Sequence, residues 1–72
     1  MPIGADELHN WFQYHSPTPE QQNKYVEIRD AAKLLAFVII DNTPSSADQT
    51  AAIRKLRECV MSANASIACG GK

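Results

Sequence analysis

The sequence has few of the features that mark small enzymes and secreted domains. Its 72 residues include two cysteines, three glycines, one tryptophan, two tyrosines and two phenylalanines. Cys59 and Cys69 have no CxxC spacing and no histidine cluster beside them, so we interpret them as free thiols and not as a disulfide framework. His9 and His15 lack the spacing of an established ligand pair, which argues against a metal site. We expect neither a metal nor a cofactor.

An excess of charge of one sign is also missing, and so is a long apolar run. Seven Lys and Arg residues stand against eight Asp and Glu residues, and the net charge is −1. Bulk attraction to DNA or to an anionic membrane is therefore not expected. The longest apolar run, residues 34–40, is far shorter than the roughly 20 residues of a membrane-spanning helix. The first residues do not have the pattern of a secretory signal, so we expect a cytoplasmic protein.

Proline residues divide the chain into an N-terminal arm and a longer helical part. A chain of this length holds one small domain, within which we assign residues 1–17 to an arm with room for a short helix and residues 18–72 to a helical hairpin. The segment Thr18–Gln21 has the spacing of a capping box, with Pro19 at the first helical position. It predicts a helix that begins there and ends at about Asn42, because the following Thr-Pro step disfavours helical geometry.

A second helix is predicted from Ser45 or Ser46 to the Gly70-Gly71 pair. Serine favours a helix N-cap, and glycine adopts the left-handed conformation that closes a helix. The short loop between the two helices favours an antiparallel hairpin. Apolar side chains at alternating spacings of three and four define one stripe on each helix. The stripes are Tyr25, Ile28, Ala32, Leu35 and Ile39 in the first helix, and Ile53, Leu56, Val60, Ala63 and Ile67 in the second.

The first of these helices carries more apolar surface than one partner helix covers. The segment 34–40 is apolar around most of its circumference. Either the arm, where Leu8, Trp11 and Phe12 share a helical face, or copies of the same chain must cover it. A domain this small usually needs disulfide bonds, a structural metal ion or association with other chains to be stable. Since no disulfide or metal is expected, we predict an all-α hairpin that assembles into a homo-oligomeric bundle.

Two groups of residues have side chains suited to a nucleotide. The arm segment Trp11–His15 holds three aromatic residues, and Arg29 and Lys33 lie one turn apart on a flank of the first long helix. Aromatic faces stack on nucleobases, and a guanidinium group binds phosphate in bidentate geometry. The alternative is structural: the aromatic side chains cover the hairpin, and the two cations pair with nearby carboxylates such as Asp30 and Glu27.

The remaining polar residues form no catalytic constellation. Isolated carboxylates such as Glu7 and Glu58 are typical of solvated helix faces, and neither cysteine has an activating base in the sequence around it. The cations Arg54, Lys55 and Arg57 spread around the second helix, which indicates solubility and salt bridges, with a second anion contact as the alternative. The residues alone therefore identify no catalytic site.

Three segments carry patterns that are modest alone and more specific together. They read F-x-Y-H, Y-x-x-I-R-x-x-A-K-x-L-A and V-M-x-A-N-A-x-I-A, at residues 12–15, 25–36 and 60–68. In this order, over most of the chain, they resemble the helical hairpin domain of phage anti-CBASS cyclic-nucleotide sponges, which one class of anti-Thoeris sponge shares. In that family small helical chains assemble, commonly as hexamers, in the cytoplasm of the infected bacterial host.

The resemblance implies a ligand and the residues that bind it. Members of the family sequester cyclic di- or oligonucleotides such as cGAMP without cleaving them, so that the CBASS effector is not activated. Carried over to this chain, the resemblance implies that Tyr14 stacks on a base, Arg29 holds phosphate and Lys33 assists, in pockets between protomers. The chain departs from the pattern at Trp11 and Cys69, where arginine is common, and this puts in doubt an additional site for cyclic trinucleotides. Whether cyclic ADP-ribose isomers also bind is a separate open question. The alternative function is a helical module that presents the segment 34–40 to a host protein as an inhibitor or adaptor.

Overall fold

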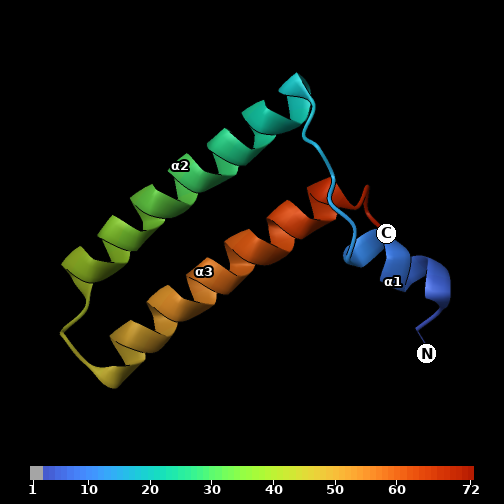
Figure 1. Ribbon diagram of the computed structural model, residues 1–72. Coiled ribbons are helices and arrows are strands. Elements are labelled where there is room, and N and C mark those ends of the chain that lie inside the picture. The colour runs from blue at the N-terminus through green and yellow to red at the C-terminus, as the bar shows by residue number, and fades with distance from the viewer. Residues whose placement is uncertain (1–2) are drawn as a thin grey trace.

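The computed structural model describes residues 3–72, which form three α-helices and no strand (Figure 1). The helices are α1 (Ala5–Trp11), α2 (Pro19–Asn42) and α3 (Ala47–Ala68). Figure 1 shows α2 and α3 running side by side in opposite directions, with α1 beside the C-terminal end of α3. The predicted all-α architecture is confirmed in its helices and in its hairpin. Within residues 3–72, no helix has the length and apolar character needed to cross a bilayer.

The ends of α2 follow from side chains that satisfy its free backbone groups. The Thr18 hydroxyl accepts a hydrogen bond from the Gln21 backbone N–H at 3.1 Å, and the Thr18 N–H donates to Gln21 Oε1 at 3.0 Å. This reciprocal pair is the predicted capping box. At the other end, Asn42 donates to the carbonyl oxygen of Val38 at 2.7 Å, before the chain becomes extended at Thr43. Both predicted ends of α2 are confirmed.

The ends of α3 are set by a serine and a pair of glycines. Ser46 Oγ accepts from the Gln49 N–H at 3.1 Å, and the Gln49 side chain also donates to the Thr43 carbonyl oxygen at 3.2 Å, which ties the loop to the helix. After Ala68 the chain turns through Gly70 and Gly71, whose φ values of 66° and 78° lie in the left-handed region that glycine tolerates. The predicted start and end of α3 are confirmed.

The core of the hairpin is a half-buried seam between α2 and α3. All five predicted stripe residues of α3 are half-buried, as are Tyr25, Ile28, Ala32 and Ile39 of α2. The prediction is wrong at Leu35, which is 48% exposed, because Ala36 takes the inner position. A helical repeat of 3.6 residues allows either residue to follow Ala32, and the smaller side chain permits a closer approach of α3.

The arm does not cover the segment 34–40. Helix α1 instead lies beside the C-terminal end of α3 (Figure 1). There the Asn10 side chain donates a hydrogen bond to the Cys69 carbonyl oxygen at 3.2 Å, and the Trp11 indole N–H donates one to the Lys72 carbonyl oxygen at 3.0 Å. The carbonyl groups that follow the end of a helix have no intrahelical partner, so they attract these two donors. Phe12 is 85% exposed and covers nothing in the hairpin.

An apolar face therefore stays open along α2. Leu34 is 67% exposed and Phe37 is 59% exposed, and their neighbours Val38 and Ile40 are also exposed. None of the side chains of residues 3–72 is fully buried within one chain. Of the two covers that the sequence allows for this face, the arm is thus excluded.

Candidate functional site

A groove of about 450 Å³ runs between α2 and α3 and brings cations from both helices together. Arg29 and Lys33 of α2 line it from one side, and Arg57 of α3 lines it from the other. Four-residue spacing on a helix places side chains on one face, which explains why Arg29 and Lys33 reach the same groove. Its apolar lining consists of Ala32, Ala36, Ile53, Leu56, Val60 and Met61.

The three cations of the groove have no carboxylate partner among residues 3–72. The ion pair within 4.0 Å in this part of the chain joins Lys24 to Glu20, at 3.7 Å on the exposed surface of α2. The alternative in which Arg29 and Lys33 pair with Asp30 and Glu27 is therefore wrong. For Arg29 the reason is geometric, because residues one or two positions apart on a helix point in different directions.

The groove offers a specific chemistry to a ligand. Guanidinium and ammonium groups bind phosphate oxygens, while an apolar lining favours the flat face of a base or another apolar group. A ligand that is anionic in one part and apolar in another matches both features. The structure brings together two of the three predicted site residues, Arg29 and Lys33.

The third predicted site residue, Tyr14, lies outside the groove. It belongs to the coil that joins α1 to α2, and its side chain is 83% exposed. Along the axis of α2, Arg29 is about 15 Å beyond the first residue of the helix. Within one chain, Tyr14 therefore does not line the groove that Arg29 lines.

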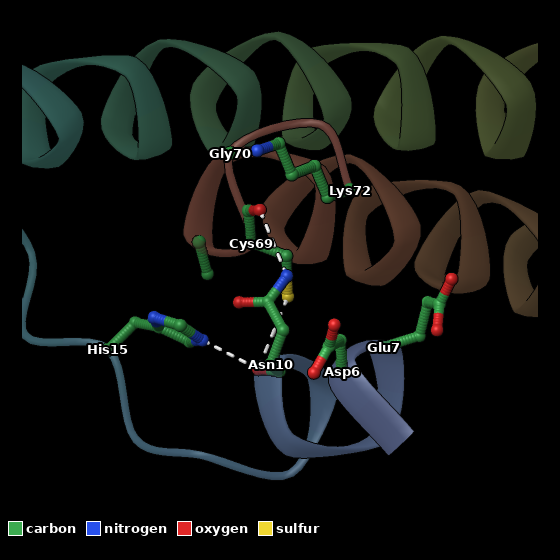
Figure 2. Close-up of a pocket in the computed structure, with 8 residues that line it drawn as sticks. Asp6, Glu7, Asn10, His15, Cys69, Gly70 and Lys72 are labelled. Carbon is green, nitrogen blue, oxygen red and sulfur yellow. Dashed lines mark hydrogen bonds between the residues drawn. The ribbon is translucent and has the colours of Figure 1, made fainter. Parts of the chain in front are cut away.

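The coil that carries Tyr14 is anchored at one end by a small hydrogen-bond network (Figure 2). The His15 Nε2–H donates to the Asn10 carbonyl oxygen at 2.6 Å, and the Asn10 side chain donates to the Cys69 carbonyl oxygen. The thiol of Cys69 in turn lies 3.9 Å from the Asn10 carbonyl oxygen. These contacts join the coil to the turn after α3, so the position of Tyr14 depends on the C-terminal end of the hairpin.

The same network borders a cavity of about 710 Å³ between α1 and the C-terminal turn (Figure 2). Besides Asn10, His15 and Cys69, its lining includes Asp6 and Glu7 of α1. In the part of the chain that the structure describes, no group of three or more His, Cys, Asp or Glu residues is placed to hold a metal ion.

Trp11 and Cys69, which lie 58 positions apart in the sequence, meet in one hollow. Trp11 and Cys69 both line a space of about 250 Å³ beside the end of α3, together with Lys72 and with small residues of α3. The indole of Trp11 is held there by its hydrogen bond to the Lys72 carbonyl oxygen. Among residues 3–72, Lys72 is the cation that lines this hollow.

From the sequence alone, Arg57 is one of three cations for which a second anion contact is only the alternative, whereas the structure places it in the groove. It follows Ile53 by four residues and precedes Val60 by three, and both of these belong to the predicted stripe of α3. A residue at this spacing lies at the edge of the stripe, where it reaches any groove that the two helices form. This spacing was the signal that could have identified it.

The fold and the groove together define a class of protein: a small all-α protein built on an antiparallel helical hairpin with a groove that cations line from both helices. A family model described as the Acb2/Tad1 hairpin domain matches residues 5–68, and the chain belongs to this family of anti-CBASS and anti-Thoeris sponges. The match covers α1, α2 and α3, and it confirms the resemblance that the three sequence patterns indicate. Neither a curated protein nor a solved structure matches the chain.

Proposed function

We propose that this protein is a phage sponge that binds cyclic di- or oligonucleotide immune messengers, such as cGAMP, without cleaving them. In the cytoplasm of an infected bacterium it would keep these messengers from CBASS effectors. The observation that carries the proposal is the groove in which Arg29 and Lys33 lie beside an apolar lining, with no carboxylate partner for either among residues 3–72. Membership of the Acb2/Tad1 family supports it independently.

The chemistry of a cyclic dinucleotide fits these groups. Its two phosphodiester groups are anionic and its two bases are flat, so it needs cations and stacking surfaces in pairs. Arg29 supplies a planar fork for a phosphate, Lys33 supplies a second cation one turn away, and Tyr14 supplies a ring for a base. Nanomolar sequestration requires about 12 kcal/mol, which two such sets of contacts are able to supply after ordering costs are subtracted.

The proposal requires a second copy of the chain. Tyr14 is exposed and outside its own groove, so the ring that stacks on a base beside Arg29 comes from a neighbouring protomer. The open apolar face around Leu34 and Phe37 gives copies of the chain a reason to associate. A two-fold axis then presents each group twice to a ligand that is itself nearly two-fold symmetric. Assembly as a hexamer, as is common in this family, meets this requirement.

Calorimetry with a panel of cyclic nucleotides tests the proposed function. The panel contains cyclic dinucleotides, cyclic trinucleotides and cyclic ADP-ribose isomers, and we expect micromolar or tighter binding of at least one cyclic dinucleotide. After heat denaturation of the complex, mass spectrometry should recover the ligand intact. Failure of every member to bind would refute the sponge, and a cleaved product would show that the protein is an enzyme.

The open apolar face favours one other function. A helical module that inhibits or recruits a host protein would present Leu34 and Phe37 to that partner instead of to copies of itself. Such a protein would be a monomer or dimer in solution, whereas the sponge is a closed assembly that buries this face. Light scattering on the purified protein distinguishes the two functions.

A further inference from the structure

Arg57 is the one cation that α3 contributes to the lining of the groove between the helices. On the opposite side lie Arg29 and Lys33, so the groove has positive charge on both of its walls. From the sequence, a second anion contact is only the alternative for Arg54, Lys55 and Arg57 as a group, and the proposed function assigns no role to Arg57. Its place in the groove distinguishes it from the other two basic residues of the same segment.

Arg54 and Lys55 are the natural comparisons for Arg57 because all three lie within one helical turn of α3. Arg54 lines an adjoining hollow of about 300 Å³ with Ile40 and Ile53, and Arg57 lines both this hollow and the groove. Lys55 is exposed, and it is rotated by about 200° around the helix from Arg57. Arg57 thus occupies the junction of two basic hollows, whereas Lys55 points elsewhere.

Arg57 forms no ion pair in the part of the chain that the structure describes. The carboxylate that shares a hollow with it is that of Glu58, on the outer side of α3. No contact within 4.0 Å joins these two residues, and within residues 3–72 Arg57 has no other carboxylate partner. A guanidinium group that has no counter-ion and borders an apolar lining is favourably placed to bind an external anion.

We infer that Arg57 is a phosphate-binding residue. It contacts the phosphate from the α3 side of the groove, while Arg29 and Lys33 contact the ligand from the α2 side. The inference rests on the proposed function and names a further residue of the same site. The occupant is the phosphodiester part of a cyclic dinucleotide. Charge complementarity decides this choice, because three cations that have no counter-ion among residues 3–72 favour an anion over an apolar helix of a second copy. A ligand bound in this way contacts both helices, so binding also holds the hairpin together.

The test compares two substitutions that remove the same charge from the same helix. Arg57→Gln keeps most of the stem and removes the cation, and Lys55→Gln does so at a position outside the groove. Calorimetry with cGAMP should show binding weakened by between about tenfold and a hundredfold for Arg57→Gln. For Lys55→Gln the change should stay within about threefold. The affinity of Arg57→Gln should also depend less steeply on salt concentration than that of the wild type.

The outcomes separate this inference from the proposed function. If the wild type binds cGAMP and both variants bind it equally well, Arg57 has no role in the site, while the sponge stands. If Arg57→Gln reduces the mass of the assembly in light scattering at unchanged affinity per folded chain, the groove is a contact between protomers and the inference is wrong. If the wild type binds no cyclic nucleotide, the proposed function fails, and the inference fails with it. If Arg57→Gln does not fold, Arg57→Lys replaces it in the test. Lysine keeps the charge but lacks the planar guanidinium fork, so binding should still weaken. An unchanged affinity of this variant would refute the inference.

Discussion

Asn10 of α1 donates a hydrogen bond to the carbonyl oxygen of Cys69, 59 positions later in the chain, at 3.2 Å. This contact joins the first helix to the turn that ends the last one. Between Asn10 and the start of α2 lies the coil that carries Tyr14, and His15 binds back to the carbonyl oxygen of Asn10. One amide side chain therefore helps to determine where the ring of Tyr14 stands relative to the hairpin.

Removal of this amide should loosen the arm while the hairpin stays folded. We expect Asn10→Ala to increase the rate of backbone amide exchange in α1 and in the following coil, and to lower the free energy of unfolding by about 1 kcal/mol. Hydrogen exchange measured by mass spectrometry checks this, with Asn23→Ala on the exposed surface of α2 as the control. Unchanged exchange in residues 5–15 would show that Asn10 does not hold the arm.

Substitutions at Tyr14 should separate stacking from hydrogen bonding. We expect Tyr14→Ala to weaken binding of a cyclic dinucleotide by about 1 to 3 kcal/mol, because the ring that stacks on a base is lost. Tyr14→Phe keeps the ring and should bind within a few-fold of the wild type. Calorimetry on both variants checks the prediction, and wild-type affinity in the alanine variant would exclude Tyr14 from the site.

Substitution of Arg29 should affect the ligand and not the assembly. Arg29→Ala is expected to weaken binding by about 2 kcal/mol or more, because a charge-assisted contact to phosphate is lost. Lys24→Ala is the matched control, since Lys24 lies on the same helix and its exposed ion pair with Glu20 contributes little. Light scattering should give both variants the mass of the wild type. Equal affinity of the two variants would show that Arg29 is misassigned.

The open face of α2 should determine the oligomeric state. We expect wild-type chains to associate and Leu34→Ser to reduce the mass measured by light scattering, because a large apolar side chain leaves the interface between copies. Asp41→Ser is a control on the same helix, at a position that is exposed and already polar. A wild-type mass of 7.9 kDa, that of one chain, at all concentrations would contradict the prediction and favour the protein-binding module.

The helices could be predicted because their boundaries are encoded locally. Each long helix begins with a hydroxyl that accepts a hydrogen bond from a backbone N–H three residues later, Thr18 from Gln21 and Ser46 from Gln49. The spacing of these residues in the sequence is therefore enough to identify where each helix begins. Gly70 ends α3 for an equally local reason, because its left-handed conformation suits a residue without a β-carbon. The facing stripes follow from helical periodicity, except where Leu35 and Ala36 compete for one position.

Features that depend on contacts between distant segments could not be read in the same way. The arm binds the end of α3 through single hydrogen bonds from Asn10 and Trp11 to backbone carbonyl groups, which leave no periodic trace in the sequence. Arg29 and Lys33 can be predicted as a pair because they lie one turn apart on one helix. Arg57 joins Arg29 and Lys33 only when the two helices pack into the hairpin. In the sequence, nothing distinguishes its charge from those of its neighbours Arg54 and Lys55.

The exposure of Leu34 and Phe37 has a consequence for when the protein works. If the chain assembles as proposed, each copy that dissociates exposes these side chains to water again. Dilution therefore lowers the stability of the assembly, because it favours the dissociated chains. The amount of competent binder then rises more steeply than the number of chains synthesised. Early in an infection, sequestration of the messenger would begin only above a threshold concentration of the chain and would not increase gradually from the first copies made.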